Sequence, residues 1–416
     1  MPRTADVAVV GDGVIGASIA CHLAAAGVDV AWFRHGLPDS SATRNSAAQV
    51  RVHQSDPHDA RMTAASLETF EHWPEAVGGN CGFQRTGFAF LVGEEYTSVV
   101  SRTVAEVASL GVETSVLCPA DLAALYPVLD LAGVGVAAYE PRGGFADPVR
   151  TTEALADRAL SLGAVAVPAP SGARLCRDGD RVTGAAADGE TVSAGDVVVA
   201  AGVGSGPLCA NAGIRLDAGS PGEDGSRGED GSPGEDGSRG DDCRPGLPVT
   251  ARRVAWAVAD VSGLPGADRL CMVIDDISGT YFRPAGEGRL LFRIPLDGVA
   301  DAGAPSDGSA SLAEAHDRLE RRLPGAALAP ICATAVAQEA YSRDGRALIG
   351  RSSRYPGLYL ATGFSGGGFK MAPAVGRFVA TDLTAGATTP TELAPYRPDR
   401  FTVGSPTPVV KRYRHM

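Results

Sequence analysis

Residues Asp6–Gly16 read DVAVVGDGVIG, a valine-rich apolar run that ends in the glycine pattern Gly11-X-Gly13-X-X-Gly16. An alanine-rich segment with helical periodicity follows at 17–27, and a second apolar run, VDVAWF, follows at 28–33. Strand, glycine turn, helix and strand in this order predict a βαβ unit that binds a dinucleotide. The first glycine makes the turn, the second lets a pyrophosphate approach the backbone, and the third lets the helix pack on the strand.

The position that usually contacts the adenosine ribose departs from this pattern. The second strand of such a unit normally ends in an acidic residue, whereas this chain has Arg34 there. Arg34 could bind a 2′-phosphate, which would indicate NADP, or it could stack on adenine or point into solvent while backbone atoms hold the ribose. Asp12 also places a carboxylate close to the expected pyrophosphate. We therefore expect modest cofactor affinity.

Composition narrows the class of protein. The chain has 416 residues, of which 44% are hydrophobic, enough for one large or two ordinary domains. Its net charge of −12 argues against binding to nucleic acid or to an anionic membrane. The eight cysteines are scattered without metal-ligand spacing, so we expect no metal site and a reducing cytoplasm. The most apolar stretch, 7–33, carries charged residues and glycine turns, so we expect neither a signal peptide nor a membrane span.

An acidic glycine-rich repeat interrupts the chain at 219–242. It consists of four hexads, GSPGED, GSRGED, GSPGED and GSRGDD, which carry half of the net charge. Eight Gly-X-Y triplets within a single chain are too few for a collagen helix. The repeat has no apolar side chain to offset the entropy of ordering, so we expect a disordered insertion.

Seven further segments follow one another along the chain and carry small residues, paired glycines or charged turns. They are Ser40–Ser46 (SSATRNS), Gly143–Pro148 (GGFADP), Asp196–Gly202 (DVVVAAG), Ser278–Pro284 (SGTYFRP), Arg343–Gly350 (RDGRALIG), Ala361–Pro373 (ATGFSGGGFKMAP) and Tyr396–Phe401 (YRPDRF). Together with the N-terminal motif, this ordered set resembles the D-amino-acid oxidase and sarcosine oxidase superfamily of FAD-dependent amine oxidoreductases. The resemblance covers nearly the whole chain apart from the acidic repeat.

The resemblance implies an α/β FAD-binding domain, Rossmann-like with the GxGxxG turn, interleaved with an α+β substrate domain that contains a mainly antiparallel sheet. The FAD-binding domain would comprise residues 1–80, 146–218 and 334–385, the substrate domain 81–145 and 243–333, and a C-terminal tail 386–416. The sequence pattern agrees in part, because Val254–Val258 and Arg289–Ile294 are typical of strands and Leu312–Leu323 of an amphipathic helix.

The resemblance also implies that FAD is the cofactor and locates its contacts. They are Gly11, Gly13, Gly16, Arg34, Arg44, Asn45, Ser46, Leu175, Ala201, Gly202, Gly363, Phe364, Ser365, Gly366, Gly367 and Gly368. The cysteine that tethers flavin in sarcosine oxidases would align near Ala337, and Cys332 is too far upstream to replace it. We therefore expect non-covalent FAD.

The expected substrate is a small amine or amino acid. Arg51 matches the arginine that grips the substrate carboxylate in sarcosine oxidase, and Lys370 matches its lysine partner. A guanidinium and an ammonium suit a carboxylate. If residues 49–53 are extended, Gln49, Arg51 and His53 share one face. His53 and Tyr281 are further candidates, although a histidine is more often structural and Tyr281 could simply pack in the sheet.

Two more departures concern the reaction. The lysine that promotes reaction with oxygen in sarcosine oxidases would fall near Leu291, so either oxygen, with Arg293 as a substitute cation, or another electron acceptor is left open. The loop histidine of that family is Gly367 here. Together, the losses at Leu291, Ala337 and Gly367 indicate a roomier and less charged pocket and a bulkier substrate. Enzymes of this kind occur in catabolism and in specialised metabolism.

Two other functions stay open at this point. Asp12, Arg34, Leu291 and Gly367 occurring together would suit a divergent flavoprotein without redox turnover. Arg34 alone would suit an NADP-dependent reductase.

Overall fold

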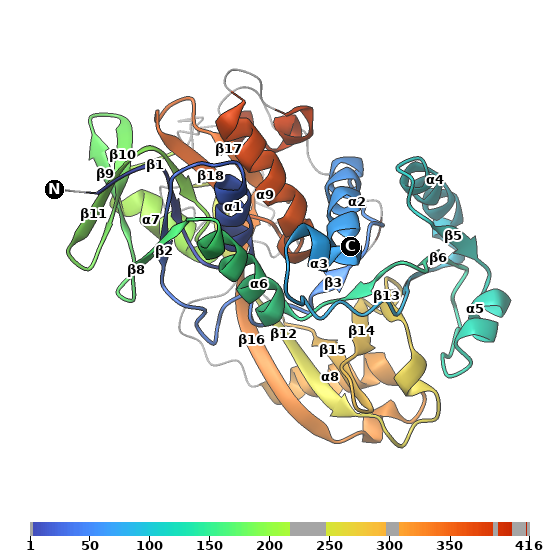
Figure 1. Cartoon of the computed structure of the whole chain (residues 1–416). Coiled ribbons are helices and arrows are strands. Elements are labelled where there is room, and N and C mark those ends of the chain that lie inside the picture. The colour runs from blue at the N-terminus through green and yellow to red at the C-terminus, as the bar shows by residue number, and fades with distance from the viewer. Residues whose placement is uncertain (1–2, 217–246, 297–307, 386–389, 402–412, 414–416) are drawn as a thin grey trace, which may run out of the picture.

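The computed structural model describes residues 3–216, 247–296, 308–385, 390–401 and Tyr413 (Figure 1). The acidic repeat at 219–242, for which the sequence predicts disorder, lies outside the described residues.

The N-terminal motif forms the βαβ unit that its glycine spacing predicts. Strand β1 (Arg3–Val10) leads into helix α1 (Val14–Ala25) and then into β2 (Val30–Arg34), which pairs with β1 in parallel. Apolar side chains on both faces of these strands bury them completely over Val7–Val10 and Val30–Phe33, as is usual for parallel strands covered on two sides.

This unit lies within an eight-stranded sheet of order β17-β18-β11-β1-β2-β8, to which β10 and β9 add an antiparallel extension. The remaining strands of the sheet are β8 (Val165–Pro168), β9 (Arg174–Asp178), β10 (Arg181–Ala187), β11 (Glu190–Val199), β17 (Leu348–Arg351) and β18 (Leu358–Thr362). Because β1 pairs in parallel with both β2 and β11, the turn after β1 opens at the carboxyl edge of the sheet, where doubly wound folds bind ligands.

Helices α1, α2 (Pro57–Glu71), α6 (Pro148–Ser161) and α9 (Gly368–Thr384) pack together beside this sheet (Figure 1). Proline begins both α2 and α6, and the side chains of Asp56 and Asp147 accept hydrogen bonds from the first backbone N–H groups of these helices. Small residues on α1 allow α9 to approach closely, and their shared core includes Ile19, Leu23 and Val375.

A second eight-stranded sheet has the order β16-β12-β15-β14-β13-β4-β6-β5 and is antiparallel except for the β13–β4 pair. Its strands are β4 (Phe88–Val92), β5 (Ser115–Leu117), β6 (Val136–Glu140), β12 (Val249–Asp260), β13 (Met272–Asp275), β14 (Thr280–Pro284), β15 (Arg289–Ile294) and β16 (Ile331–Ser342). Helix α8 (Gly308–Glu320) packs on β14 and β15, and α4 (Thr97–Ala108) packs on β6. The strands expected at 254–258 and 289–294 are confirmed within β12 and as β15, and the helix expected at 312–323 corresponds to α8.

Short elements connect the two sheets. Strand β3 (Gln49–Val50) pairs with β7 (Gly144–Phe145), and Ser41 bridges to Gln338 of β16. The other short helices are α3 (Trp73–Ala76), α5 (Pro119–Leu125), α7 (Ser205–Asn211), η1 (Glu94–Tyr96), η2 (Gly202–Gly204), η3 (Ala267–Arg269), η4 (Ala326–Leu328), η5 (Thr391–Tyr396) and η6 (Pro398–Phe401). The expected fold class, an α/β nucleotide-binding sheet interleaved with a mainly antiparallel one, is confirmed.

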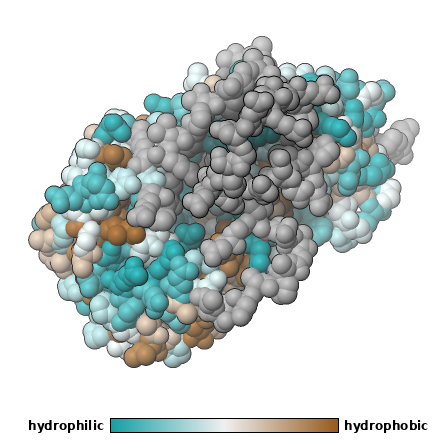
Figure 2. All heavy atoms as spheres, turned by 180° about the vertical axis from the view of Figure 1, so that it is seen from behind, coloured by the Kyte–Doolittle hydropathy of each residue, from teal (hydrophilic) through white to brown (hydrophobic). Residues whose placement is uncertain are grey.

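On the face of the molecule seen from behind, hydrophilic and hydrophobic residues are interspersed over the described part (Figure 2). Within the described residues, no helix combines the length and the apolar character that crossing a membrane would require.

Candidate active site

A cavity of about 510 Å³ opens where the turn after β1 meets the loops that follow β2, β11 and β18. Its lining also includes Gln338, Glu339 and Ala340 of β16, so it extends from the nucleotide-binding turn to the second sheet. Of the predicted cofactor contacts, ten line it: Gly11, Gly13, Ser46, Ala201, Gly202, Gly363, Phe364, Ser365, Gly366 and Gly368.

The glycines of the first turn are required by close backbone contacts. Gly11 has a φ of 120°, which side-chain-bearing residues rarely adopt, and a Cβ there would collide with the carbonyl of Ala200. A Cβ on Gly16 would collide with the carbonyl oxygen of Gly11, so Gly16 packs the helix onto the turn and does not line the cavity. Thr43 caps the helix, because its Oγ1 accepts the N–H of Val14 at 3.1 Å.

The two unusual charges near the turn have different surroundings. Asp12 lines the cavity, and its Oδ2 accepts the N–H of Gly36 at 2.6 Å. The guanidinium of Arg34 lies over the ring of Trp32, 4.5 Å from its centroid, and Arg34 is not part of the cavity lining. Trp32 in turn donates from Nε1 to the carbonyl oxygen of Gly11 at 2.9 Å. Arg34 thus stacks on a side chain that supports the turn.

Arg44, Asn45 and Leu175 are predicted cofactor contacts that are not among the residues that line the cavity. Arg44 donates from Nε to the carbonyl of Leu37 at 3.2 Å, and the amide of Asn45 donates to the carbonyls of Asp39 and Ser41. Both residues therefore shape the loop that carries Ser46. Leu175 lies on β9 and its side chain is buried in the core.

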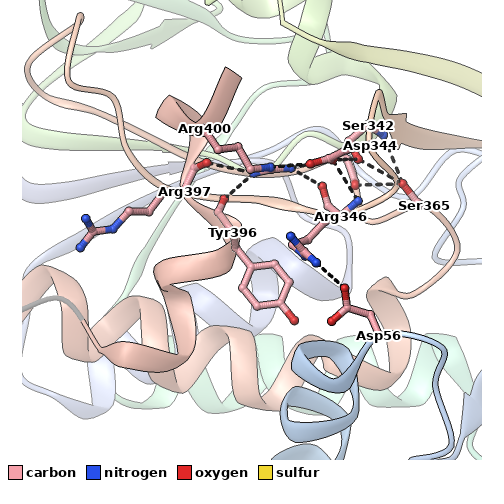
Figure 3. A network of polar contacts seen from close by, with 9 residues as sticks. Asp56, Ser342, Asp344, Arg346, Ser365, Tyr396, Arg397 and Arg400 are labelled. Atoms are coloured by element: carbon pink, nitrogen blue, oxygen red, sulfur yellow. Dashed lines mark hydrogen bonds and ion pairs between the residues drawn. The ribbon is translucent and has the colours of Figure 1, made fainter. Parts of the chain in front are cut away.

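The glycine loop 363–368 is fixed by a polar network (Figure 3). Ser365, which has a φ of 50°, donates its N–H to Ala340 and accepts the N–H of Ser342 on Oγ at 3.2 Å. Arg400 makes two bonds to Asp344, at 2.7 and 2.9 Å, in the turn that follows Ser342. The YRPDRF segment thus braces the loop from outside.

The other side of this network reaches helix α2. Arg346 forms a buried ion pair with Asp56, the cap of α2 (Figure 3). Tyr396 donates to Asp59 at 2.7 Å. The predicted contact Gly367 caps the start of α9 and is outside the cavity lining. The network therefore sets the orientation of α9, on which Lys370 lies.

Lys370 and Arg51, the predicted carboxylate-binding pair, are both buried and lie near each other. The Nζ of Lys370 donates to the carbonyl of Gly366 at 3.1 Å. Burial, reinforced by Arg51, lowers the pKa of Lys370 to about 7, and burial lowers the pKa of Arg51 to about 10. The guanidinium lies 5.3 Å from the ring centroid of Phe88, and its Nη1 donates to the carbonyl of His53. Both cations would gain stability from a bound anion.

Glu140 holds the backbone beside Arg51, a role for which the sequence offered no signal. Its carboxylate is buried at the end of β6 and accepts the N–H groups of Val52 and His53 at 2.9 and 2.6 Å. Burial raises the pKa of Glu140. Tyr413 was also missed, and its hydroxyl lies 2.9 Å from Nε2 of the buried His53. His53 is thus enclosed between Glu140 and Tyr413.

Tyr281, on β14, is partly buried, and burial together with Glu339 raises its pKa to about 12. Glu339 was not among the predicted residues, although it lines the cavity. Arg283, two residues along β14, donates to the carbonyls of Ala47 and Pro284 at 2.6 and 2.7 Å. Leu291 is buried on β15.

Within the described residues, no three His, Cys, Asp or Glu side chains are grouped as a metal site would require.

Comparison with known proteins agrees with this geometry. The family model described as FAD dependent oxidoreductase matches residues 6–223 and 235–381. The 4-methylaminobutanoate oxidase (formaldehyde-forming) of Paenarthrobacter nicotinovorans is 26% identical over 393 residues, which cover 93% of this chain and 44% of that protein. The chain therefore spans less than half the length of that relative. FAD-dependent oxidoreductase domain-containing protein 1 of Xenopus laevis is 26% identical and is covered to 83%, with 96% of this chain matched.

Solved structures share the fold. L-proline dehydrogenase from P. horikoshii superposes with a TM-score of 0.81 at 24% identity, covering 97% of this chain and 99% of that one. Glycine oxidase from Geobacillus kaustophilus gives a TM-score of 0.73 at 23% identity, covering 95% and 98%. With a family model that matches most of the chain, on a fold and a glycine-lined cavity that suit a dinucleotide, the chain belongs to the FAD-dependent oxidoreductase family.

Proposed function

We propose that the chain oxidises a C–N bond of an amino acid, or of a related carboxylate-bearing amine, to the imine. The observation that carries this proposal is the buried pair of cations, Arg51 and Lys370, beside the glycine loop of the cavity. FAD, when bound, would supply the acceptor for the hydride that leaves the carbon beside the nitrogen.

The residues of the cavity fit FAD. Gly11 and Gly13 present bare backbone to the cavity, and helix α1 begins directly after them at Val14, which suits a pyrophosphate. Arg34 lies over Trp32 outside the lining, so it offers no support for an NADP 2′-phosphate. None of the seven described cysteines lines the cavity, and Ala337 is buried on β16, which supports non-covalent attachment.

Arg51 and Lys370 would bind the substrate carboxylate. The ammonium of Lys370 has three N–H donors, one of which is directed at Gly366, so others can meet an anion. Both side chains are buried, and charge-assisted bonds are stronger there than at a surface. Glu140 and the His53 carbonyl fix the position of Arg51, which pre-organises the site for a carboxylate.

The second part of the proposal concerns the electron acceptor that reoxidises the flavin. Leu291 is apolar and buried on β15, and Arg293 donates from Nη1 to the carbonyl of Gly279 at 3.0 Å. Leu291 therefore offers no charge that would stabilise superoxide, and Arg293 is not among the residues that line the cavity. We infer that the protein works as a dehydrogenase, with faster turnover on an artificial electron acceptor than on oxygen. Peroxide formed in air at the same rate would contradict this inference.

Anaerobic reduction of the FAD-loaded protein tests the proposed activity. A screen of amino acids should find substrates that bleach the flavin absorbance. Arg51→Ala and Lys370→Ala should each retain flavin but raise KM by about thirtyfold or more, because each leaves a buried carboxylate with one partner fewer. Arg51→Lys, which keeps the charge but loses the planar fork, should fall in between.

Arg289→Ala is the matched control, since Arg289 is an exposed cation on β15 paired with Glu287. It should leave KM unchanged. If Arg51→Ala and Lys370→Ala both had the same kinetics as the parent protein, these two residues would not bind the substrate carboxylate. If the purified protein were colourless and took up no added FAD, the proposed function as a whole would be wrong.

A further inference from the structure

Glu339 is an acidic side chain at the end of the cavity near the two cations. Asp12, at the nucleotide-binding turn, is the other acid among the described lining residues. The Oε2 of Glu339 accepts the hydroxyl of Tyr341 at 3.3 Å, and it lies 3.7 Å from where a Cβ of Gly366 would be. The carboxylate therefore lies against the glycine loop and close to Lys370.

The charged side chains around Lys370 differ in their access to the cavity. Arg51, Glu339 and Asp59 are all close enough to Lys370 to influence its pKa, and Asp59 accepts the hydroxyl of Tyr396 at 2.7 Å. Of these charged residues only Glu339 is among the described residues that line the cavity. Two buried cations therefore lie near the glycine loop, and Glu339 is the carboxylate near Lys370 that a ligand in the cavity can meet.

The Glu339 carboxylate has no direct counterion in the part of the chain that the structure describes. Among the described residues, no Lys, Arg or His nitrogen lies within 4.0 Å of Glu339, and the nitrogen of Lys370 donates to Gly366 instead. A carboxylate in a water-poor site is costly unless a cation or several hydrogen-bond donors compensate it. Burial accordingly raises the pKa of Glu339. A bound cation would remove that cost.

We propose that Glu339 binds the ammonium group of the substrate while Arg51 and Lys370 bind its carboxylate, so that the site prefers zwitterionic amino acids to simple carboxylates. This inference rests on the proposed function and deepens it. An amino acid has its two opposite charges on adjacent groups, which matches a site whose two cations and one carboxylate are neighbours. Tyr341 would act as a positioning residue, since its hydroxyl orients the carboxylate.

Two ligands of the same shape but different charge test the inference. Betaine is a trimethylammonium carboxylate, and 3,3-dimethylbutanoate replaces its nitrogen with carbon, so the two differ by one positive charge. Betaine has no nitrogen lone pair and stays unoxidised. Their dissociation constants would be measured from the spectral change of the FAD-saturated protein, first for the parent chain and then for Glu339→Gln. Glu287→Gln, which removes an exposed acid outside the cavity lining, is the matched control.

In the parent protein and in Glu287→Gln, betaine should bind more tightly than 3,3-dimethylbutanoate by about tenfold or more. In Glu339→Gln that ratio should fall to near one, chiefly through weaker betaine binding. An equal ratio in the parent protein and in Glu339→Gln would overturn the inference while leaving the carboxylate-binding pair in place. If neither ligand bound to the parent protein, the assignment of Arg51 and Lys370 as carboxylate-binding residues would be wrong, and the inference about Glu339 would be wrong with it.

Discussion

The nucleotide-binding turn and the carboxylate-binding pair are built in opposite ways. The turn is made of backbone and small side chains from short continuous segments, such as 10–15 and 200–204. The pair and its neighbours are charged or aromatic side chains from residues 51, 140, 339, 370 and 413, which no short segment contains. The first region depends on the absence of side chains, and the second depends on contacts between distant ones.

Gly16→Ala should have the largest effect of the predicted changes, because it adds a side chain where the turn has no room. The new Cβ would meet the carbonyl oxygen of Gly11, and backbone cannot move aside as a flexible side chain can. We expect loss of FAD binding and a fall of about 3 kcal/mol in the free energy of unfolding. Flavin retained after desalting and urea unfolding measure the two effects.

Gly206→Ala is the control for this substitution. Gly206 lies in α7, has no unusual φ and has no heavy atom within 4 Å of an added Cβ. Alanine there should be neutral or stabilising by about 0.5 kcal/mol. If Gly16→Ala behaved like Gly206→Ala, the turn would not depend on the close contact.

The same contrast explains what the sequence could predict. The spacing of Gly11, Gly13 and Gly16 determines local backbone geometry, so the βαβ unit and its cavity follow from a few consecutive residues. Arg51 and Lys370 were identified through segments that resemble a known family. The sequence does not show that they lie together, because their proximity depends on how α9 packs beside β3.

Other predicted contacts lie elsewhere because neighbouring side chains decide their orientation. Leu175 points into the core of its own sheet, and Arg34 stacks on Trp32, which the sequence places nearby without specifying the contact. Glu140 and Tyr413 gave no signal at all, since a single acid at a strand end and a tyrosine near the C-terminus are common surface residues. Tertiary packing alone makes them neighbours of His53.

The pH dependence of carboxylate binding should be the next largest effect. The pKa of Lys370 is lowered to about 7, from an unfolded value near 10.5, so the folded protein loses this proton first as pH rises. Below pH 7 Lys370 is charged and binds an anion, and above pH 7 it becomes neutral. Affinity for 3,3-dimethylbutanoate, which does not titrate in this range, should therefore fall by up to about tenfold per unit above pH 7.

Lys370→Met is the matched variant for this profile, because it keeps the length of the side chain without the charge. Its affinity for the same ligand should be weaker at pH 6 and should vary less with pH, and the remaining slope would come from Glu140, whose pKa burial raises to about 7 beside Arg51. The effect of Lys370 on the free energy of unfolding has the opposite dependence on pH. Between pH 7 and about 10.5, Lys370 is protonated in the unfolded chain but not in the folded protein, so its contribution makes the folded protein more stable as pH rises. A profile of ligand affinity that is equally steep in Lys370→Met would assign the titration to another group.

Tyr413→Phe should have the smallest effect. This substitution tests whether Tyr413 contributes to carboxylate binding. Tyr413 is buried against Phe90, with ring centroids 4.6 Å apart, and its hydroxyl meets Nε2 of His53. Removing the hydroxyl keeps the ring, so the free energy of unfolding should fall by only about 1 kcal/mol. Because Tyr413 is also near Arg51, carboxylate affinity should weaken a few-fold as well.

Tyr139→Phe separates these two effects. Tyr139 lies on β6, as Glu140 does, and its hydroxyl pairs with that of Tyr126 at 3.1 Å, away from Arg51. Both variants should lose similar stability in urea unfolding, but only Tyr413→Phe should weaken binding of 3,3-dimethylbutanoate. Equal ligand affinity in the two variants would limit Tyr413 to packing. If only Tyr413→Phe binds the ligand more weakly, Tyr413 helps to hold Arg51 and His53 in position although it is far from them in the sequence. Such long-range contacts distinguish the carboxylate-binding pair from the nucleotide-binding turn.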